Sequence, residues 1–483
     1  MIKIENLSLS FSKNKEVFSA IDCEFEKGKI SLVSGKSGCG KSSLLMSLMR
    51  LIPGTIDGRV GGNILFKDRR INEVPTFEMA DKMSYVFQDP ESQLCTFTVE
   101  EELAFGLENL NVEPEVIREK IDYYLELLEI GFLKNRPLNS LSGGEKQLVA
   151  IATIIAMEPE VLILDEPTAN LDPKMTNKIF STIKKIQDLK QTTIIIVEHK
   201  IDEIIDWIDD IFWLEKKEMK KITKNELKKT IESVQLKTWE IKEEKTDICL
   251  KAKDISFSYG DAEVLNNVSF ELNYGQVLAI VGHNGAGKST LFKIIMGLER
   301  CKSGEVWIGD SEIKDMSPCL IGSRMGLAFQ NPEHQFLKDS VESELKFGMN
   351  SIDKKYEMER LEYYLKEFEL EDVRLQNPFT LSQGQKRRLS TASIMIGGQK
   401  ILLLDEPTYG QDRENLIKLM KSLESLRRDG KSVVMITHDL ELVRKCCDKV
   451  VIINDGQSIF EGNREEFLAK ASDDMGCIYG KNF

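Results

Sequence analysis

The sequence lacks the features of a secreted, zinc-binding or membrane-spanning chain. Its nine cysteines are odd in number and form no Cys-x-x-Cys pair, although Cys446 and Cys447 are adjacent, so neither a disulfide framework nor a zinc site is expected. The first residues, MIKIENLSLSFS, lack the basic segment and apolar core of a signal peptide. No apolar run approaches the roughly 18 residues needed to span a bilayer. We therefore expect a soluble, reduced chain that could act at a membrane only through a partner.

Positive charge is also in the minority. The 483 residues carry 65 Lys and Arg against 79 Asp and Glu, a formal net charge of −14. Because affinity for nucleic acids rests largely on Lys and Arg, no nucleic-acid partner is expected. The lysine-rich stretch EKKEMKKITKNELKK (215–229) aligns with NDGQSIFEGNREEF (454–467) near the other end of the chain. It is interpreted as an exposed hairpin and helix rather than a basic tail.

The sequence does contain a series of motifs that each occur twice. GKSGCGKSS (35–43) recurs as GHNGAGKST (282–290), YVFQDPESQ (85–93) as LAFQNPEHQ (327–335), LSGGEKQL (141–148) as LSQGQKRR (381–388), VLILDEPTANLD (161–172) as ILLLDEPTYGQD (401–412), and IIIVEH (194–199) as VVMITH (433–438). The offset falls smoothly from 247 residues at the first phrase to 239 at the last. A period this long is not that of a solenoid repeat, so we expect two duplicated domains.

The duplicated halves set the expected domain boundaries and fold class. The first domain is predicted to span 1–231 and the second 248–483, joined by a polar, charged linker, 232–247. Short apolar runs such as SLVSG and LAIVG end at a Gly-rich loop and are followed by helical spacing. Runs such as VLILD and ILLLD resemble strands buried on both faces of a parallel sheet. The expected class is α/β, with two tandem phosphate-loop domains built on mainly parallel core sheets.

The two Gly-rich loops carry the strongest chemical signal. Their GxxxxGK[ST] pattern, placed between a strand and a helix, turns backbone N–H groups toward one point and favours a bound phosphate. The first loop consists of Gly35, Lys36, Ser37, Gly38, Cys39, Gly40, Lys41, Ser42 and Ser43, and the second of Gly282, His283, Asn284, Gly285, Ala286, Gly287, Lys288, Ser289 and Thr290. Lys41 and Lys288 are expected at the β- and γ-phosphates of ATP, and Ser42 and Ser289 at Mg²⁺.

Acidic residues follow a strand in each half. Asp165 and Asp405 end apolar runs, where a carboxylate can hold the metal beside the phosphates. Glu166 and Glu406 come next and are interpreted as general bases for the attacking water. The alternative for each glutamate is an acid in the first turn of a helix, stabilised by the helix dipole.

Histidine is scarce, with four in the chain. His199 and His438 both end strand-like runs at the same point of each half, which favours a contact to the γ-phosphate over a structural role. His283 and His334 correspond to Lys36 and Ser92 in the first half and, as histidines, are interpreted as incidental.

In both halves a phosphate loop, a Gln loop, an LSGGE-type signature, an LDEPT strand, an Asp loop and a switch histidine occur in the same order. In these motifs the chain resembles the ATPase subunits of ATP-binding-cassette proteins over nearly its whole length. The resemblance implies a helical signature subdomain in each domain, with ATP and Mg²⁺ as cofactors. It also implies that the two domains of the one chain pair head to tail, each nucleotide lying between the phosphate loop of one domain and the signature of the other.

The resemblance also assigns the members of each site. The first site would join Gly35–Ser43, Gln88, Asp165, Glu166 and His199 to Ser382 and Gly384, and the second would join Gly282–Thr290, Gln330, Asp405, Glu406 and His438 to Ser142, Gly143 and Gly144. Gln88 and Gln330 would reach the metal or the water. Phe11 and Tyr259 would stack on adenine, the alternative for either ring being packing in the core.

Shorter phrases point to a branch of the family. FQDPESQLCTFTVEEELAFGLENL and its counterpart look like the ATPases of energy-coupling-factor importers of vitamins and metal ions, in their fused form. That likeness implies an integral membrane coupling protein and a small substrate-capturing membrane protein as partners, and a location at the cytoplasmic face of the cell membrane. Two alternatives stay open: a tandem ATPase of a sugar-type importer, and a ribosome-associated tandem translation factor.

Two further expectations concern differences in detail. Asp89, Glu91 and Glu333 follow the Gln loops and could pair with arginines of a membrane partner. Gln383 stands where the first signature has Gly143, and the Asp loops at 169–172 and 409–412 also differ. Because glycine allows closer backbone approach than glutamine, the two sites are predicted to be unequal, with slower turnover at the Lys41 site.

Overall fold

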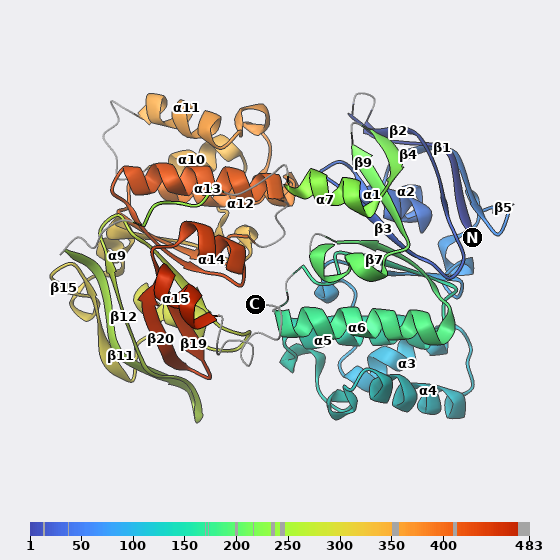
Figure 1. Cartoon of the computed structure of the whole chain (residues 1–483), viewed down its shortest axis with the longest axis horizontal. Coiled ribbons are helices and arrows are strands. Elements are labelled where there is room, and N and C mark those ends of the chain that lie inside the picture. Colours follow the sequence, from blue (N-terminus) through green and yellow to red (C-terminus); the bar gives the residue numbers. More distant parts are fainter. Residues whose placement is uncertain are drawn as a thin grey trace. The chain divides into compact units, whose positions relative to one another are not determined.

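The computed structural model of the chain describes residues 1–12, 15–36, 38–169, 171, 173–198, 201–215, 217–232, 237–241, 247–349, 357–408 and 413–471. The chain divides into two compact units, Met1–Ser233 and Val234–Phe483, and each is described by itself. In Figure 1 the first unit runs from blue to green and the second from yellow-green to red. Among the described helices, none combines the length and apolar character needed to cross a membrane.

The first unit holds two sheets and seven α-helices in its described part. Its strands are β1 (Ile2–Ser12), β2 (Lys15–Phe25), β3 (Ile30–Gly35), β4 (Arg59–Phe66), β5 (Arg69–Arg70), β6 (Met83–Val86), β7 (Val161–Asp165), β8 (Thr193–Val197), β9 (Asp210–Glu215) and β10 (Glu218–Ile222). Its helices are α1 (Lys41–Leu48), α2 (Leu51–Gly54), α3 (Val99–Asn109), α4 (Pro114–Leu127), α5 (Gly143–Ala156), α6 (Pro173–Lys190) and α7 (Lys224–Glu232).

The second unit repeats this plan. Its strands are β11 (Ile248–Tyr259), β12 (Ala262–Asn273), β13 (Val277–Val281), β14 (Ser303–Ile308), β15 (Ser311–Glu312), β16 (Met325–Ala328), β17 (Ile401–Asp405), β18 (Ser432–Ile436), β19 (Lys449–Asn454) and β20 (Gln457–Asn463). Its helices are α8 (Lys288–Ile295), α9 (Pro318–Arg324), α10 (Val341–Gly348), α11 (Glu357–Glu367), α12 (Gln383–Met395), α13 (Arg413–Arg428), α14 (Leu440–Cys446) and α15 (Arg464–Ala471).

A six-stranded sheet forms the centre of each unit. The strand order is β10-β9-β3-β8-β7-β6 in the first unit and β20-β19-β13-β18-β17-β16 in the second. Five strands of each sheet are parallel, and the hairpin strand at one edge, β10 or β20, is antiparallel. The predicted α/β class with mainly parallel core sheets is therefore confirmed.

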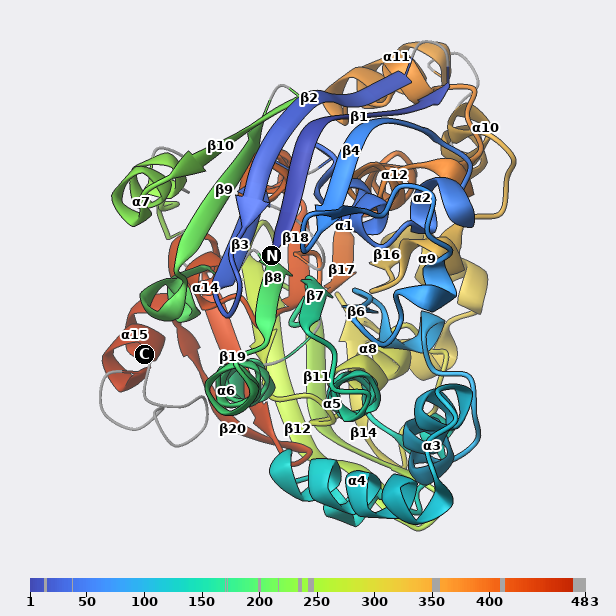
Figure 2. The same ribbon diagram turned by 90° about the vertical axis from the view of Figure 1, so that its right-hand side faces the viewer.

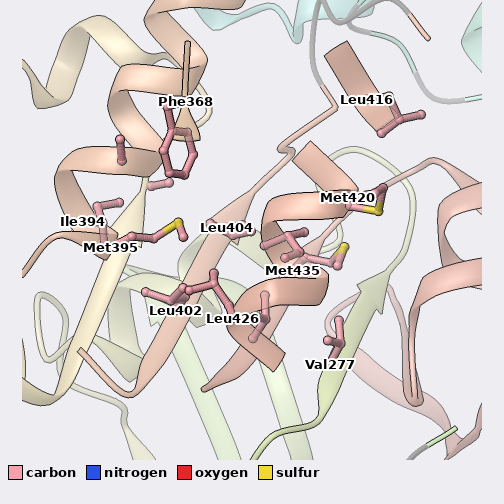
Figure 3. Packing of buried hydrophobic residues seen from close by; sticks show 14 of the residues in the cluster. Val277, Phe368, Ile394, Met395, Leu402, Leu404, Leu416, Met420, Leu426 and Met435 are labelled. Atoms are coloured by element: carbon pink, nitrogen blue, oxygen red, sulfur yellow. The ribbon is translucent and has the colours of Figure 1, made fainter. Parts of the chain in front are cut away.

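The central strands bury side chains on both faces, as their continuous apolar runs predict. In β17, Leu402 and Leu404 belong to one apolar cluster, while Ile401 and Leu403 belong to another on the opposite face. Figure 3 shows the first of these clusters, to which Met420 of α13 also belongs. β7 divides its residues between two clusters in the same way. Such a sheet leaves only the strand ends for polar chemistry.

A second, antiparallel sheet in each unit was not expected from the sequence. Its order is β2-β1-β4-β5 in the first unit and β12-β11-β14-β15 in the second, and β1, β2 and β4 lie side by side in Figure 2. The apolar alternation of β1 slips by one residue at Asn6, where φ is +50° and the register shifts. This bulge keeps Ile4 and Leu7 on the same, buried face.

Short helices form a separate layer in each unit. In the first unit α3 and α4 pack beside α5 (Figure 1), and in the second α10 contacts both α11 and α12. Capping boxes at Thr98, Ser142, Ser340 and Ser382 start four of these helices, and such caps satisfy the free N–H groups of a first turn. The predicted helical signature subdomain is thus present in both units.

Part of the predicted linker packs on the second unit. Trp239 is buried, its backbone N–H donates to Lys445 O at 2.7 Å, and Arg464 donates to its carbonyl at 2.7 Å. The guanidinium of Arg427 lies 5.6 Å from the centroid of the indole ring. Although residues 232–247 are mostly polar, Trp239 packs into the second unit, and residues 237–241 belong to the fold of that unit.

Candidate functional site

The Gly-rich loop of the first unit turns the chain from β3 into α1. A Cβ on Gly35 would stand 2.2 Å from Leu214 O, and Gly40, at the N-cap of α1, has φ +102°. No side chain fits the first position, and the left-handed backbone of the second favours glycine. Ser37 lies outside the described residues.

The Gly-rich loop of the second unit, between β13 and α8, has the same two glycine constraints. A Cβ on Gly282 would lie 2.2 Å from Ile453 O, and Gly287, the N-cap of α8, has φ +93°. Both loops therefore present a helix N-terminus, whose free N–H groups and dipole favour an anion.

The loop lysines are buried and fold back onto their own loops. Lys41 Nζ donates to Gly35 O at 2.9 Å and to Lys36 O at 3.1 Å. Lys288 Nζ donates to Gly282 O at 2.8 Å and to His283 O at 2.9 Å. Each ammonium group is thus held at the centre of its loop, where a phosphate would meet both the positive charge and the N–H groups.

A buried carboxylate stands beside each loop, at the end of β7 or β17. The Oδ1 atoms of Asp165 and Asp405 are buried and accept no hydrogen bond from the described residues. The pKa of Asp405 is raised to about 6. Burial is the largest cause and the charge of Glu406 the next, while a hydrogen bond from Ser289 acts in the opposite direction. Burial likewise raises the pKa of Asp165, against hydrogen bonds from Tyr85 and Ser42.

These groups fit a hard divalent cation. A cation beside each loop would favour the ionised form of a carboxylate that burial disfavours, and a serine hydroxyl is already in reach of each acid. Among the described residues no three His, Cys, Asp or Glu side chains gather into a protein-only metal site. Mg²⁺ tolerates this, because it usually takes one or two carboxylates and completes its shell with phosphates and water.

Tyr85 is a site residue that the sequence analysis missed. Its hydroxyl donates to Asp165 Oδ2 at 2.6 Å and so orients the carboxylate. The corresponding position in β16 is Leu327, so Asp405 has no such donor from that strand. The sequence shows a tyrosine in one copy and a leucine in the other, and it gives no sign of the contact with Asp165.

Glu166 and Glu406 have an unusual backbone. Their φ angles are +48° and +47°, and their N–H groups donate to Val197 O at 2.9 Å and Ile436 O at 3.0 Å. A left-handed conformation in a non-glycine residue costs about 1–3 kcal/mol and gathers at functional sites. Since α6 and α13 begin only at Pro173 and Arg413, neither glutamate lies in the first turn of a helix, and that alternative is wrong.

The two glutamates have different described partners. Gln88 Nε2 donates to Glu166 Oε2 at 2.9 Å. In the second unit, His438 Nε2 lies 2.9 Å from Glu406 Oε1 and 3.0 Å from Asn284 Oδ1. Burial would raise the pKa of Glu406, but the hydrogen bond and charge of His438 lower it below its usual value. The second unit thus brings loop, acid, base and histidine together, while His199 lies outside the described residues.

The signature serines start helices, as expected. Ser142 caps α5 and Ser382 caps α12, each in a capping box, with Glu145 or Gln385 three residues on. Gly143 and Gly144 begin α5, and Gly384 follows the first residue of α12. The side chain of Gln383 lies outside the described part, as do most residues of the Asp loops. The pairing of each signature with the loop of the other unit stays a prediction.

The two aromatic residues predicted to stack on adenine are not core residues. Phe11 is 41% exposed and Tyr259 44% exposed, at the ends of β1 and β11. Tyr259 also meets Phe257 edge to face, with the ring centroids 4.7 Å apart. The core-packing alternative does not describe either ring, and both have a free surface on which a base could stack.

The carboxylates after the Gln loops differ from expectation. Glu91 pairs with Lys146 of α5, and Glu333 pairs with Lys386 of α12 at 2.5 Å. Both acids therefore already have a partner inside their own unit, on the helix that carries the signature. A contact of Asp89, Glu91 or Glu333 with an arginine of a membrane partner stays a prediction, and it would have to compete with these lysines.

The sequence of each unit matches a known family. A family model described as "ABC transporter" matches residues 18–169 and 265–409. The chain belongs to the ABC transporter family. Because the match occurs twice, once in each unit, it is a tandem ABC ATPase that binds and hydrolyses ATP.

Curated ABC relatives align with nearly the whole chain. One, from Bacillus subtilis (strain 168), is named provisionally as the HMP/thiamine import ATP-binding protein YkoD; it is 36% identical over 97% of this chain and 93% of its own length. Another, from Methanosarcina mazei, is named provisionally as an ABC transporter ATP-binding protein; it is 32% identical over 96% of this chain and 89% of its own length.

A solved structure has a similar fold over nearly the whole chain. It is described as a model of ribosome-bound archaeal Pelota and ABCE1, and it superposes with a TM-score of 0.72 over 98% of this chain and 81% of that chain. The sequences are 20% identical, so the likeness shows a shared fold and nothing further.

The close approach of the backbone at Gly282 can be tested by adding one methyl group there. We expect Gly282→Ala, in a chain that also carries Lys41→Ala, to weaken ATP binding on the order of tenfold or more. The new Cβ would stand 2.2 Å from a backbone oxygen, and a loop displaced by about 1 Å misplaces its phosphate donors. Titration with a fluorescent ATP analogue measures the affinity. Gly322→Ala, in α9 of the same unit, whose Cβ would meet nothing within 4 Å, is the matched control. Affinity within twofold of the parent would contradict the cradle geometry.

Proposed function

We propose that the chain is the ATP-hydrolysing subunit of a membrane importer of energy-coupling-factor type, which carries a vitamin, a vitamin precursor or a metal ion. An integral membrane coupling protein and a small substrate-capturing membrane protein would hold it at the cytoplasmic face of the membrane. The observation that carries the proposal is the presence of two sets of catalytic groups in one chain, each with a buried lysine, an aspartate whose Oδ1 atom is buried and a strained glutamate.

In this proposal each residue has a definite role. The loop N–H groups with Lys41 and Lys288 bind the β- and γ-phosphates, and Asp165 and Asp405 hold Mg²⁺ together with Ser42 and Ser289. Glu166 and Glu406 take a proton from the attacking water. Gln88 and Gln330 contact metal or water, and His199 and His438 contact the γ-phosphate. Phe11 and Tyr259 stack on adenine.

Closure of the two units on each other would complete the sites. Ser382 and Gly384 would bind the nucleotide held by Lys41, while Ser142, Gly143 and Gly144 would bind the one held by Lys288. The signature serines cap helices, so the donors at those helix N-termini would reach the γ-phosphate only on closure. Motion of the units would in this way follow ATP binding and hydrolysis.

The importer branch has support from the named relatives. The Bacillus subtilis protein named for HMP/thiamine import aligns with 97% of this chain, and thiamine is a vitamin. A relative that shares both ATPase units is expected to use similar membrane partners, since partner contacts are made by the same units. The transported solute itself is expected to touch the partners and not this chain.

Exposed apolar residues beside the Gln loops support a docked partner. Phe97 is 85% exposed and Leu337 is 67% exposed. Both lie in loops that a buried carboxylate holds: Glu102 accepts from the N–H groups of Cys95 and Thr96, and Glu344 from those of Leu337 and Lys338. We take these two side chains as candidate contacts for a docked partner, because binding residues are often carried on loops that a rigid scaffold positions.

A ribosomal role is less well supported. The likeness to the ABCE1 complex concerns the fold alone, and the net charge of −14 is unfavourable for binding ribosomal RNA. A sugar-type importer would share the ATPase chemistry and differ in its membrane partners. Identification of the membrane protein that co-purifies with the chain separates these alternatives.

The catalytic assignment predicts the behaviour of a double variant. Glu166→Gln combined with Glu406→Gln should lower ATP turnover by about 10²–10⁴-fold, because each site loses its general base. Binding of Mg-ATP should stay within about threefold, since the loops and lysines are intact. Phosphate release and nucleotide binding measure the two effects. Turnover within a few-fold of the parent would show that these glutamates are not the bases.

The partner surface predicts a separation of functions. Phe97→Ser combined with Leu337→Ser should lower co-purification of the membrane partners at least about fivefold, because burial of each large apolar side chain contributes about 1.5–3 kcal/mol. ATP binding by the chain alone should not change.

A matched control uses apolar side chains that are similarly exposed but lie away from the Gln loops. Phe77 is 76% exposed and Leu298 is 60% exposed, and Phe77→Ser with Leu298→Ser should leave the complex intact. Equal recovery of partners with both double variants would remove Phe97 and Leu337 from the interface.

A further inference from the structure

One buried arginine joins three parts of the second unit. Arg387 lies on α12, five residues after the capping serine Ser382, and is 3% exposed. Its Nη1 donates to Phe329 O at 2.8 Å, and its Nη2 donates to Gln330 O at 2.9 Å and to Glu406 O at 2.8 Å. The guanidinium therefore binds the signature helix to the backbone of the Gln loop and to that of the proposed general base.

The described residues of the first unit show no equivalent connection. The corresponding residue of α5 is Gln147, which is also 3% exposed, and its Nε2 has no hydrogen-bond partner among the described residues. The carbonyl of Glu166 accepts from the backbone N–H of Ala169 at 3.1 Å instead. The two copies thus differ at a buried position, and among the described residues its side chain donates to the catalytic segments in the second unit.

Neighbouring contacts strengthen the same connection in the second unit. Gln335, just after the Gln loop, donates to Ser390 O at 3.0 Å and to Ser393 Oγ at 2.6 Å, both on α12. The corresponding Gln93 accepts from the N–H of Phe87, within its own loop, at 3.2 Å. The ion pairs of Glu333 and Glu91 with their helix lysines occur in both units. Apart from that shared pair, the described residues show these contacts between the Gln loop and the signature helix in the second unit and none like them in the first.

We propose that Arg387 is a positioning residue for hydrolysis at the second site: it sets the backbone of Gln330 and Glu406 relative to α12. The inference rests on the proposed role of Glu406 as the general base. A planar guanidinium fixes several acceptors in one plane, and its burial makes each of these hydrogen bonds costly to lose. Because Glu406 has a strained backbone, its side chain depends on such support to stay aimed at the attacking water.

The test isolates each site in the full chain. In a Glu166→Gln background the remaining ATP turnover reports Glu406, and in a Glu406→Gln background it reports Glu166. Arg387→Gln, which installs the residue of the first unit, should lower the Glu406-dependent kcat by about 10- to 100-fold, because displacement of a catalytic group by about 1 Å has an effect of this size. KM for ATP should stay within about threefold, since Lys288 and its loop are untouched.

Controls separate positioning from a general weakening of the helix. Glu166-dependent turnover should change less than about threefold with Arg387→Gln. Arg388→Gln removes the same charge from the same helix, but Arg388 donates to Phe368 O and Asn415 Oδ1, so Glu406-dependent turnover should be kept. If Arg387→Gln does not fold, Arg387→Lys, which keeps the charge and can reach fewer carbonyls, should lower kcat in the same direction.

Each outcome decides the proposal. A loss of kcat confined to the Glu406-dependent reaction, with KM preserved, supports it. Equal losses in both backgrounds, or a kcat unchanged by Arg387→Gln, overturn it. Failure of the base assignment is distinguishable, because turnover would then survive in the Glu166→Gln, Glu406→Gln chain that retains Arg387.

Discussion

Burial of the central parallel strands on both faces is the constraint on which the rest of each unit depends. β7 and β17 place alternate side chains into two apolar clusters, so a charged group has no place along their length. Asp165 and Asp405 stand at the strand ends, where the Gly-rich loops also begin. The carboxyl ends of parallel strands share one edge of a sheet, and phosphate-binding and acidic groups meet there for that reason.

Much of this arrangement could be predicted from the sequence, because it depends on local patterns. Continuous apolar runs gave the parallel strands, and glycines with a following lysine gave the loops at Lys41 and Lys288. Tyr85 and Arg387 could not be found in this way, because their roles come from contacts with residues distant in sequence. The antiparallel sheet was missed since its alternation is broken by a bulge at Asn6, and Trp239 was missed since the residues around it are polar.

The two units share their proposed catalytic residues more closely than the residues that hold those side chains and backbones in place. Both keep the lysine, the acid and the strained glutamate. At corresponding positions, however, the first half has Tyr85 and Gln147 where the second has Leu327 and Arg387. The first unit orients its aspartate with a hydroxyl, and the second supports its glutamate with a guanidinium. Slower turnover at the Lys41 site stays a prediction based on Gln383, because these differences arise inside each unit: Arg387 favours the second site and Tyr85 the first.

The central claim is that one chain builds two nucleotide sites, each on its own loop lysine. Equilibrium binding of labelled Mg-ATP to the Glu166→Gln, Glu406→Gln chain measures this directly, because nucleotide is then retained without turnover. The account predicts two ATP bound per chain, one after Lys41→Ala or Lys288→Ala alone, and none after both. One ATP per parent chain, or two retained by either single lysine variant, would contradict it.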